Sequence, residues 1–241
     1  MGPAFGWGAL AASSLVLGAL LGVVRVWPRQ VIGLVLAFGA GALISAVSFE
    51  LAANGIREAS TGVVALGLAA GALTYFVCDL IIDRRTSTER PGARHAEGGG
   101  TSLALGAFLD GIPEQLVLGI GLAAGQGVGV GLLVAIFVSN LPEAIGSASD
   151  MRVAGHGATA ITRLWVAVAV ICTLATVAGY AIADSTSGGF KGAANGFAAG
   201  ALLVMLIDTM IPEASRQSGR TAGLAATLGF ALATGLSTLT A

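Results

Sequence analysis

Asp110-Gly111-Ile112-Pro113-Glu114 is one of three stretches in which a Pro-Glu pair interrupts an apolar run long enough to cross a lipid bilayer. The other two are Ser-Asn-Leu-Pro-Glu at residues 139–143 and Asp-Thr-Met-Ile-Pro-Glu at residues 208–213. A charged side chain inside a bilayer costs roughly 2.5 to 3.5 kcal/mol on insertion scales, so such acids usually have a partner or a task. Each proline also leaves a helical carbonyl without its usual donor at the same depth. The three stretches together predict an oxygen-rich cation site inside a membrane.

Composition places the whole chain in the membrane class. The 241 residues include 10% charged residues and have a mean hydropathy of +0.87, whereas charged residues make up about 25% of a soluble globular domain. Cys78 and Cys172 lie inside apolar runs, which argues against a disulfide framework and favours buried thiols. The arginines are scattered between apolar runs rather than gathered on a basic face, so a nucleic-acid partner is not expected.

Eight apolar runs are each near the ~20 residues that a helix needs to cross the hydrocarbon core. We therefore predict an all-α membrane protein, a single domain over residues 1–241. Its predicted spans are Ala4–Val26, Val31–Ala53, Thr61–Ile82, Thr101–Ala124, Gly127–Ala148, Leu164–Ala183, Phe190–Ala214 and Thr221–Ala241. No basic segment precedes the first run, so we expect a retained span rather than a cleaved signal. The polar stretch 83–100, rich in Gly, Ser, Pro and mixed charges, is expected to be a flexible cytoplasmic loop.

The basic residues indicate how these spans are oriented. Arg57 and Lys191 fall on one side of the predicted topology. Ten others fall on the opposite side, namely Arg25, Arg29, Arg84, Arg85, Arg90, Arg94, Arg152, Arg163, Arg216 and Arg220. The positive-inside rule puts these ten in the cytoplasm and both termini outside. The prediction is a multi-pass cell-membrane protein, and the Ala- and Gly-rich composition suggests a bacterial inner or plasma membrane.

Glycine recurs at intervals of four residues, as in Gly192, Gly196 and Gly200. Small residues at this spacing form a smooth stripe on a helix and let membrane helices approach closely. The pattern predicts close helix packing within the bilayer. It is compatible with a homodimer, although packing within one chain explains it equally well.

The strongest candidate site lies on the fourth and fifth spans. Asp110 and Glu114 are four residues apart and share one helix face. Ser139 and Glu143 do the same on the next span, and Asn140 comes three residues before Glu143. Because two or three residues join the spans, we expect an antiparallel hairpin that brings both clusters to similar depth, facing each other. If these acids were only protonated hydrogen-bonding groups, two facing clusters that each contain a proline would be unexpected.

The stretches at residues 110–114 and 139–143 resemble the paired motifs of ZIP (zinc- and iron-regulated-transporter-like) metal transporters. Eight spans, both ends outside and a longer loop after the third span also match that family. The resemblance implies a two-metal site that binds and passes divalent cations. Carried over by position, Asp110, Glu114, Ser139 and Glu143 would line one metal position. Asn140 would join the two glutamates, as bridging ligands, around the second.

The candidate ligands depart from the family pattern. Asp110 and Ser139 stand where the family usually has histidine, Gly111 stands where it often has asparagine, and the sixth span has no acid. Without imidazoles the site is harder and richer in oxygen, which suits Mn²⁺ or Fe²⁺, whereas the family implies zinc. We expect a divalent metal ion as the transported substrate, with zinc as the family default, and no prosthetic group.

Further acids extend the predicted path toward both membrane faces. Glu50 lies near the outer end of the second span, where metal would arrive, whereas Asp79, Asp208 and Glu213 lie toward inner ends, where it would leave. An alternative reading makes Glu50 and Asp79 interface residues that snorkel outward. The opposite placement of the acids on spans two and seven also hints at an inverted repeat. It would relate spans one to three with spans six to eight around the central pair.

Our leading hypothesis is a divalent cation importer that exposes a mid-membrane site alternately to the two sides. One rival is an intramembrane aspartyl protease with Asp110 and Asp208 as its dyad. Such enzymes usually show Gly-x-Gly before the aspartate, whereas Phe108 and Leu109 precede it in this chain. The other rival is a non-transporting relative that senses metal or scaffolds a complex.

Overall fold

A computed structural model describes the backbone of residues 1–87, 99–123, 130–184 and 188–240. Within these ranges it describes the side chains of residues 1–81, 111–123, 130–183 and 188–238. Most of the predicted cytoplasmic loop (88–98) and the turn between the fourth and fifth spans therefore lie outside the described residues. Every regular element in the described ranges is a helix.

The helices follow one another with short connections. In chain order the α-helices are α1 (Gly2–Val24), α2 (Arg29–Ala46), α3 (Ala53–Glu58), α4 (Thr61–Ser87), α5 (Gly99–Ala123), α6 (Val130–Val153), α7 (Ala158–Asp184), α8 (Gly188–Met205), α9 (Ile211–Ser218) and α10 (Thr221–Thr240). Two π-helical segments complete the fold, η1 (Val47–Ala52) between α2 and α3 and η2 (Leu206–Met210) between α8 and α9. α4 continues to Ser87, so its backbone includes the first residues of the stretch predicted as a loop.

The predicted set of eight crossing helices is confirmed in outline. Seven helices of the described ranges are long and apolar enough to span a membrane, and α5 contributes the apolar helix Gly111–Ala123 from its described part. Two crossings are composite: α2, η1 and α3 form a run of 30 residues, and α8, η2 and α9 form one of 31. Helices suit this composition because they satisfy their backbone polar groups internally, as a bilayer requires. The chain is a multi-pass membrane protein.

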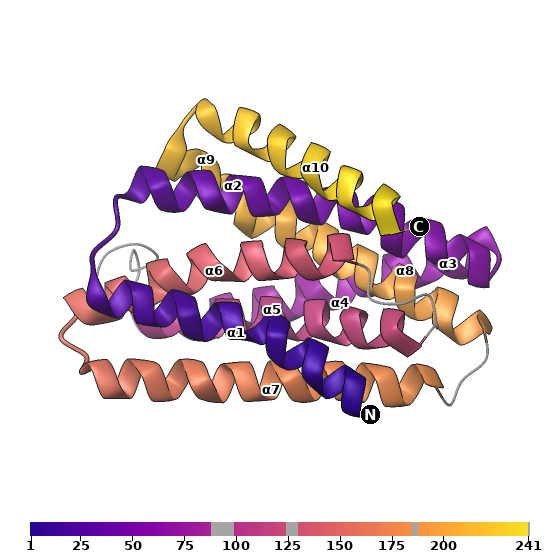
Figure 1. Ribbon diagram of the computed structural model, residues 1–241, viewed down its shortest axis with the longest axis horizontal. Coiled ribbons are helices and arrows are strands. Elements are labelled where there is room, and N and C mark those ends of the chain that lie inside the picture. The colour runs from indigo at the N-terminus through magenta and orange to yellow at the C-terminus, as the bar shows by residue number, and fades with distance from the viewer. Residues whose placement is uncertain (88–98, 124–129, 185–187, 241) are drawn as a thin grey trace.

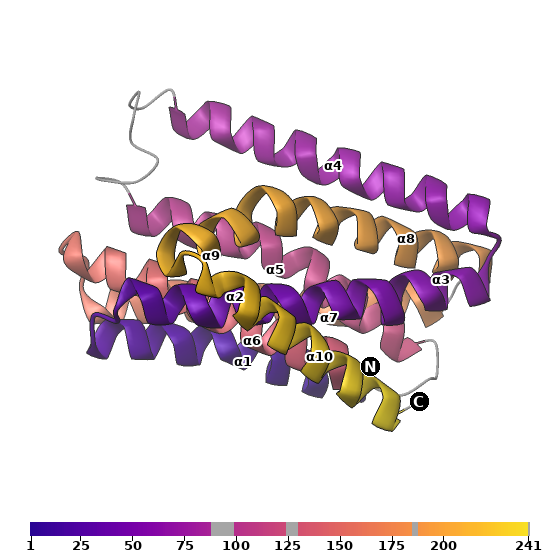
Figure 2. The ribbon, with the colours of Figure 1, turned by 90° about the horizontal axis from the view of Figure 1, so that it is seen from above.

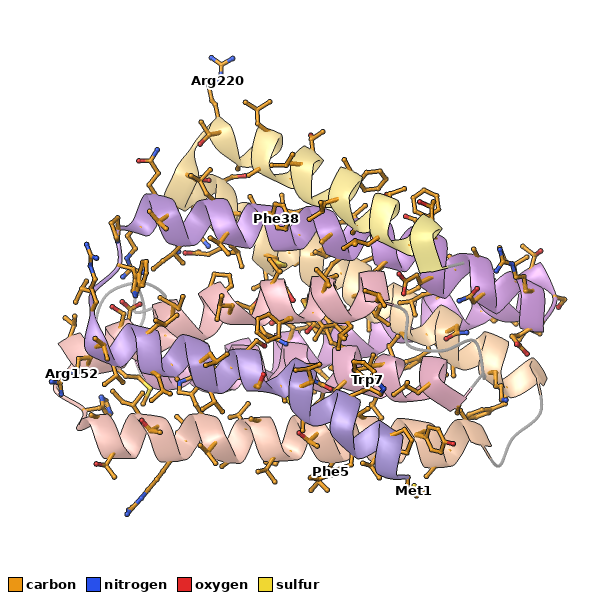
Figure 3. All side chains as sticks on the ribbon, in the orientation of Figure 1. Met1, Phe5, Trp7, Phe38, Arg152 and Arg220 are labelled. Carbon is orange, nitrogen blue, oxygen red and sulfur yellow. The ribbon has the colours of Figure 1, made fainter. Side chains whose placement is uncertain are left out.

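The helix axes run roughly parallel along the long dimension of the molecule, and both chain termini lie at the same end (Figure 1). Arg152 and Arg220 lie at the opposite end from Met1 (Figure 3). An even number of crossings returns the chain to its starting side, so the shared position of the termini agrees with eight spans.

The helix pairs repeat in a symmetric pattern. α4 packs against α8, and α10 packs against α2; α5 packs against α7, and α1 packs against α6. Exchanging α1 with α7, α2 with α8, α4 with α10 and α5 with α6 maps each of these pairs onto another. The two π-helical segments also exchange under this operation. The pairing agrees with the inverted repeat that the sequence predicts around the central α5–α6 pair.

Glycines allow the outer helices to approach the bundle closely. A Cβ built at Gly71 of α4 would lie 1.8 Å from the carbonyl oxygen of Phe197 on α8. On the other side, a Cβ at Gly41 of α2 would lie 1.8 Å from the carbonyl oxygen of Ala226 on α10. Figure 2 shows α4 lying beside α8 along its length. The close helix packing predicted from the glycine spacing is therefore present within the chain.

Candidate metal site

The two central motifs lie within continuous helices. Pro113 lies inside α5 and Pro142 lies inside α6, and both helices continue beyond their proline. A proline has no N–H to donate, so the carbonyls of Leu109 and Val138 lose their usual helical partners. Each motif therefore adds a backbone acceptor one turn before its proline, within the centre of the bundle.

Ser139 joins the two motifs directly. Its hydroxyl Oγ donates to Glu114 Oε1 at 3.2 Å, and both side chains are only 1% exposed. The same hydroxyl lies 3.0 Å from the carbonyl oxygen of Ile136. α2 packs closely against α6 at Ser139: a Cβ built at Gly39 of α2 would lie 2.9 Å from Ser139 Cα. The structure thus brings a carboxylate of α5 and a hydroxyl of α6 together, as the hairpin prediction requires.

Asn140 adds a second polar group at this level of α6. It is 1% exposed, and neither Oδ1 nor Nδ2 has a hydrogen-bond partner within the part of the chain that the structure describes. Leaving a buried polar group unpaired costs about 1–3 kcal/mol, so native proteins rarely do so without a reason. A cation that arrives from outside would give the amide oxygen a partner.

The remaining predicted ligands are placed less completely. Glu143 is half-buried on α6, one turn after Ser139. The backbone of Asp110 lies in α5 one turn before Glu114, but its side chain lies outside the described residues. Across the described side chains, no group of three His, Cys, Asp or Glu residues is arranged to hold a metal ion. The contribution of Asp110 and Glu143 to a metal site therefore stays a prediction.

Glu50 has a partner that sequence reasoning did not predict. Its Oε1 and Oε2 accept hydrogen bonds of 3.1 and 3.2 Å from the backbone N–H of Leu132, the third residue of α6. A carboxylate at a helix N-terminus satisfies a free N–H and complements the helix dipole. Gly131 leaves room for this contact, because a Cβ there would lie 2.3 Å from Glu50 Oε1. Glu50 thus ties η1 to the helix that carries the second motif.

The other predicted path acids are distributed over separate helices. Asp208 is exposed within η2, and Asp79 is half-buried on α4. Glu213 on α9 forms an ion pair with Arg216 and accepts a hydrogen bond of 2.5 Å from Gln217 Nε2. The role of these three acids in a transport path stays a prediction.

A hydrogen bond and a close packing contact between α5 and α7 were also not predicted from the sequence. Thr176 Oγ1 donates to Gln115 Oε1 at 2.5 Å, and both side chains are fully buried. One turn earlier, Cys172 Sγ lies over Gly111, 2.9 Å from where a Cβ would be. No spacing in the sequence relates these two helices, because the register between them is set by tertiary packing.

Comparison with known proteins gives one informative relative. No family model matches the chain. A putative zinc transporter of Arabidopsis thaliana is 31% identical over 206 residues, which cover 83% of this chain. The matched part makes up 33% of that plant protein, so the chain spans about a third of its relative's length.

Proposed function

The chain belongs to the ZIP family of metal transporters, and from that premise we propose that it carries divalent metal ions across a membrane between α5 and α6. The observation that carries the proposal is the polar group at the centre of the bundle. There, the two motif helices contribute the buried Glu114 carboxylate, the Ser139 hydroxyl bonded to it and the Asn140 amide, which has no hydrogen-bond partner among the described residues. Carboxylate and amide oxygens are established ligands of divalent cations.

Each residue has a defined role in the proposal. Glu114 and Glu143 supply the charge that offsets the desolvation of a divalent ion, and they bridge two metal positions. Asp110 and Ser139 complete the first position, and the Asn140 amide oxygen completes the second. Glu50 would receive metal at one face of the membrane, whereas Asp79, Asp208 and Glu213 would release it at the other.

Zinc is the proposed substrate, because the plant relative is named for zinc. The oxygen ligands of α5 and α6 would also accept Mn²⁺ or Fe²⁺, since carboxylates and amides suit harder ions. The two bundles of the inverted repeat would rock around the central pair, exposing the site first to one side and then to the other. The positive-inside rule would place the arginine-rich end of the bundle in the cytoplasm, so the metal ion would move into the cell.

Uptake of ⁶⁵Zn²⁺ into proteoliposomes tests the proposal. Glu114→Gln and Glu143→Gln remove charge at the site with little change in shape, so uptake should fall to the level of empty liposomes. Glu58→Gln, at the end of α3, is a matched control that should retain uptake. Full uptake by both site variants would refute the assignment. If the wild-type protein binds metal without uptake, the alternative of a non-transporting, metal-sensing protein would be favoured.

A further inference from the structure

Cys172 of α7 carries a buried thiol that packs against α5 at Gly111, within the motif at residues 110–114. The side chain is 0% exposed, and the cysteine is free of any disulfide. Its sulfur fills the space over Gly111, since a Cβ at that glycine would come within 2.9 Å of Cys172 Sγ. Any larger residue at position 111 would push the thiol away from this turn. Gly111 directly follows Asp110 and lies one turn before Glu114.

The thiol and the Glu114 carboxylate share one buried environment. Gly111, over which the thiol lies, is three residues before Glu114 on α5, so both groups belong to the same turn of that helix interface. Glu114 is itself 1% exposed, so the carboxylate, like the thiol, is shielded from water. α7, which contains no acid in its membrane run, therefore contributes a potential ligand to the same interior.

A second buried polar group, the Asn140 amide, lies on α6. Ala144, four residues after Asn140 and on the same helix face, belongs to one buried cluster with Cys172. Both polar atoms of the Asn140 amide lack a hydrogen-bond partner within the described residues, although the side chain is 1% exposed. A carboxylate, an amide and a thiol from three helices thus all lie buried in the bundle.

A hydrogen bond fixes the register that places the thiol there. Gln115 is four residues after Gly111, and Thr176 is four residues after Cys172, so the two contacts lie one turn apart. The 2.5 Å bond from Thr176 Oγ1 to Gln115 Oε1 joins α5 to α7 at the second of these levels. The position of Cys172 over Gly111 is therefore built into the packing of both helices.

We propose that Cys172 is a ligand of the metal ion held at Glu114, so that the site combines sulfur with oxygen. The inference rests on the proposed function, which it deepens by naming the class of ion. A thiol binds metal as the thiolate, so its proton leaves when the ion arrives. Thiolate favours Zn²⁺ and Cd²⁺ over harder ions such as Mn²⁺ and Mg²⁺. Cys172 then offsets the absence of histidine from both motifs.

The test measures metal binding by the purified protein in detergent. Cd²⁺ bound to thiolate gives an ultraviolet charge-transfer band that oxygen ligands do not give. Wild type and the control Cys78→Ser, which removes the exposed thiol of α4, should both show the band on Cd²⁺ addition. Cys172→Ser should lose the band and bind Cd²⁺ roughly tenfold or more weakly. Its Mn²⁺ affinity should stay within about threefold of wild type, which also shows that the variant is folded.

Two further variants sharpen the result. Cys172→Ala, which keeps the site apolar, should also lack the band. Gly111→Ala should weaken Cd²⁺ binding, because the new methyl group would displace the sulfur. A band that persists in Cys172→Ser, that disappears with Cys78→Ser instead, or that is absent from the wild type overturns the proposal. If uptake depends on Glu114 but the band does not depend on Cys172, only the thiol assignment fails; if uptake does not depend on Glu114, the transport proposal itself fails.

Discussion

Asn140 illustrates how a binding residue can reduce the stability of the empty protein. Its amide is 1% exposed and has no hydrogen-bond partner within the described residues, while its neighbour Ser139 bonds to Glu114. An unpaired buried polar group costs about 1–3 kcal/mol, whereas an apolar group of similar shape carries no such cost. If metal provides the missing partner, selection for transport explains why the cost persists.

Asn140→Leu should therefore separate stability from transport. Without metal, its free energy of unfolding in detergent should equal that of wild type or exceed it by up to about 1 kcal/mol, because an unpaired amide is removed. Its ⁶⁵Zn²⁺ uptake in proteoliposomes should be lost. Asn54→Leu is the control, since the Asn54 amide bonds to Arg57 on α3 and should not be needed for uptake. A clear loss of stability in Asn140→Leu would show that the amide has a structural role.

The sequence predicted part of the candidate site because part of it is local. Ser139 and Asn140 precede Glu143 on one helix, and Pro113 precedes Glu114, so their helix faces follow from spacing alone. The short connection between the spans then predicted the meeting of Glu114 with Ser139, which the structure shows. The contact of Cys172 with Gly111 could not be predicted, because it depends on the register in which α7 packs along α5.

At the scale of the element, the contact between η1 and α6 gives a second prediction. The Glu50 carboxylate accepts the N–H of Leu132 with both oxygens, in the position of a helix N-terminal cap. Glu50→Ala should lower the free energy of unfolding by about 1–2 kcal/mol, since loss of a cap leaves the N–H unpaired. Chemical denaturation of the detergent-solubilised protein, followed by the helical circular dichroism signal, measures the change.

Two variants check the origin of that loss. Glu58→Ala removes another acid at the end of α3 and should have little effect on unfolding. Gly131→Ala should resemble Glu50→Ala, because its methyl group would occupy the place of the Glu50 carboxylate. If Glu50→Ala is as stable as wild type but loses uptake, Glu50 acts on metal rather than as a cap.

The glycine stripe between α4 and α8 gives a third prediction. Gly71→Ala would place a methyl group 1.8 Å from the carbonyl oxygen of Phe197, so α4 must move away from α8. Overpacking of this kind costs about 1–3 kcal/mol, and we expect a lower thermal midpoint and a lower yield of monodisperse protein. Gly62→Ala on the same helix has open space around its new methyl group and should match wild type. Equal midpoints for the two variants would contradict close packing of α4 on α8.

The helical elements themselves were largely predictable, whereas their irregularities were not. Long apolar runs and the demand for internally bonded backbone in lipid predict helices, and the eight crossings follow from counting those runs. The π-helical turns at Val47–Ala52 and Leu206–Met210 carry Glu50 and Asp208 but have no spacing signal in the sequence. An extra residue in a helical turn shifts the face on which later side chains lie, and π-bulges often occur at functional sites. Their matching places in the two halves support the inverted repeat.

At the scale of the whole molecule, charge and topology together predict an orientation. Both termini lie at one end, while Arg152 and Arg220 lie at the other (Figures 1 and 3). Arg29 at that basic end forms an ion pair with Asp150 at 2.6 Å and remains 60% exposed, which suits a face in contact with water. The positive-inside rule places this end in the cytoplasm. The direction of metal movement in the transport proposal depends on that placement.

Labelling of single cysteines in intact cells tests the orientation. In a Cys78→Ser background, Ser60→Cys lies in an exposed turn between α3 and α4, and Arg220→Cys lies in an exposed turn before α10. We expect a membrane-impermeant maleimide to label Ser60→Cys in intact cells and Arg220→Cys only after permeabilisation, because the two turns lie on opposite sides of the bilayer. The background protein is the control, since its remaining Cys172 is 0% exposed and should not react. The reverse labelling pattern would show that the basic end faces outward. That result would contradict the positive-inside placement, on which the inward direction of transport depends.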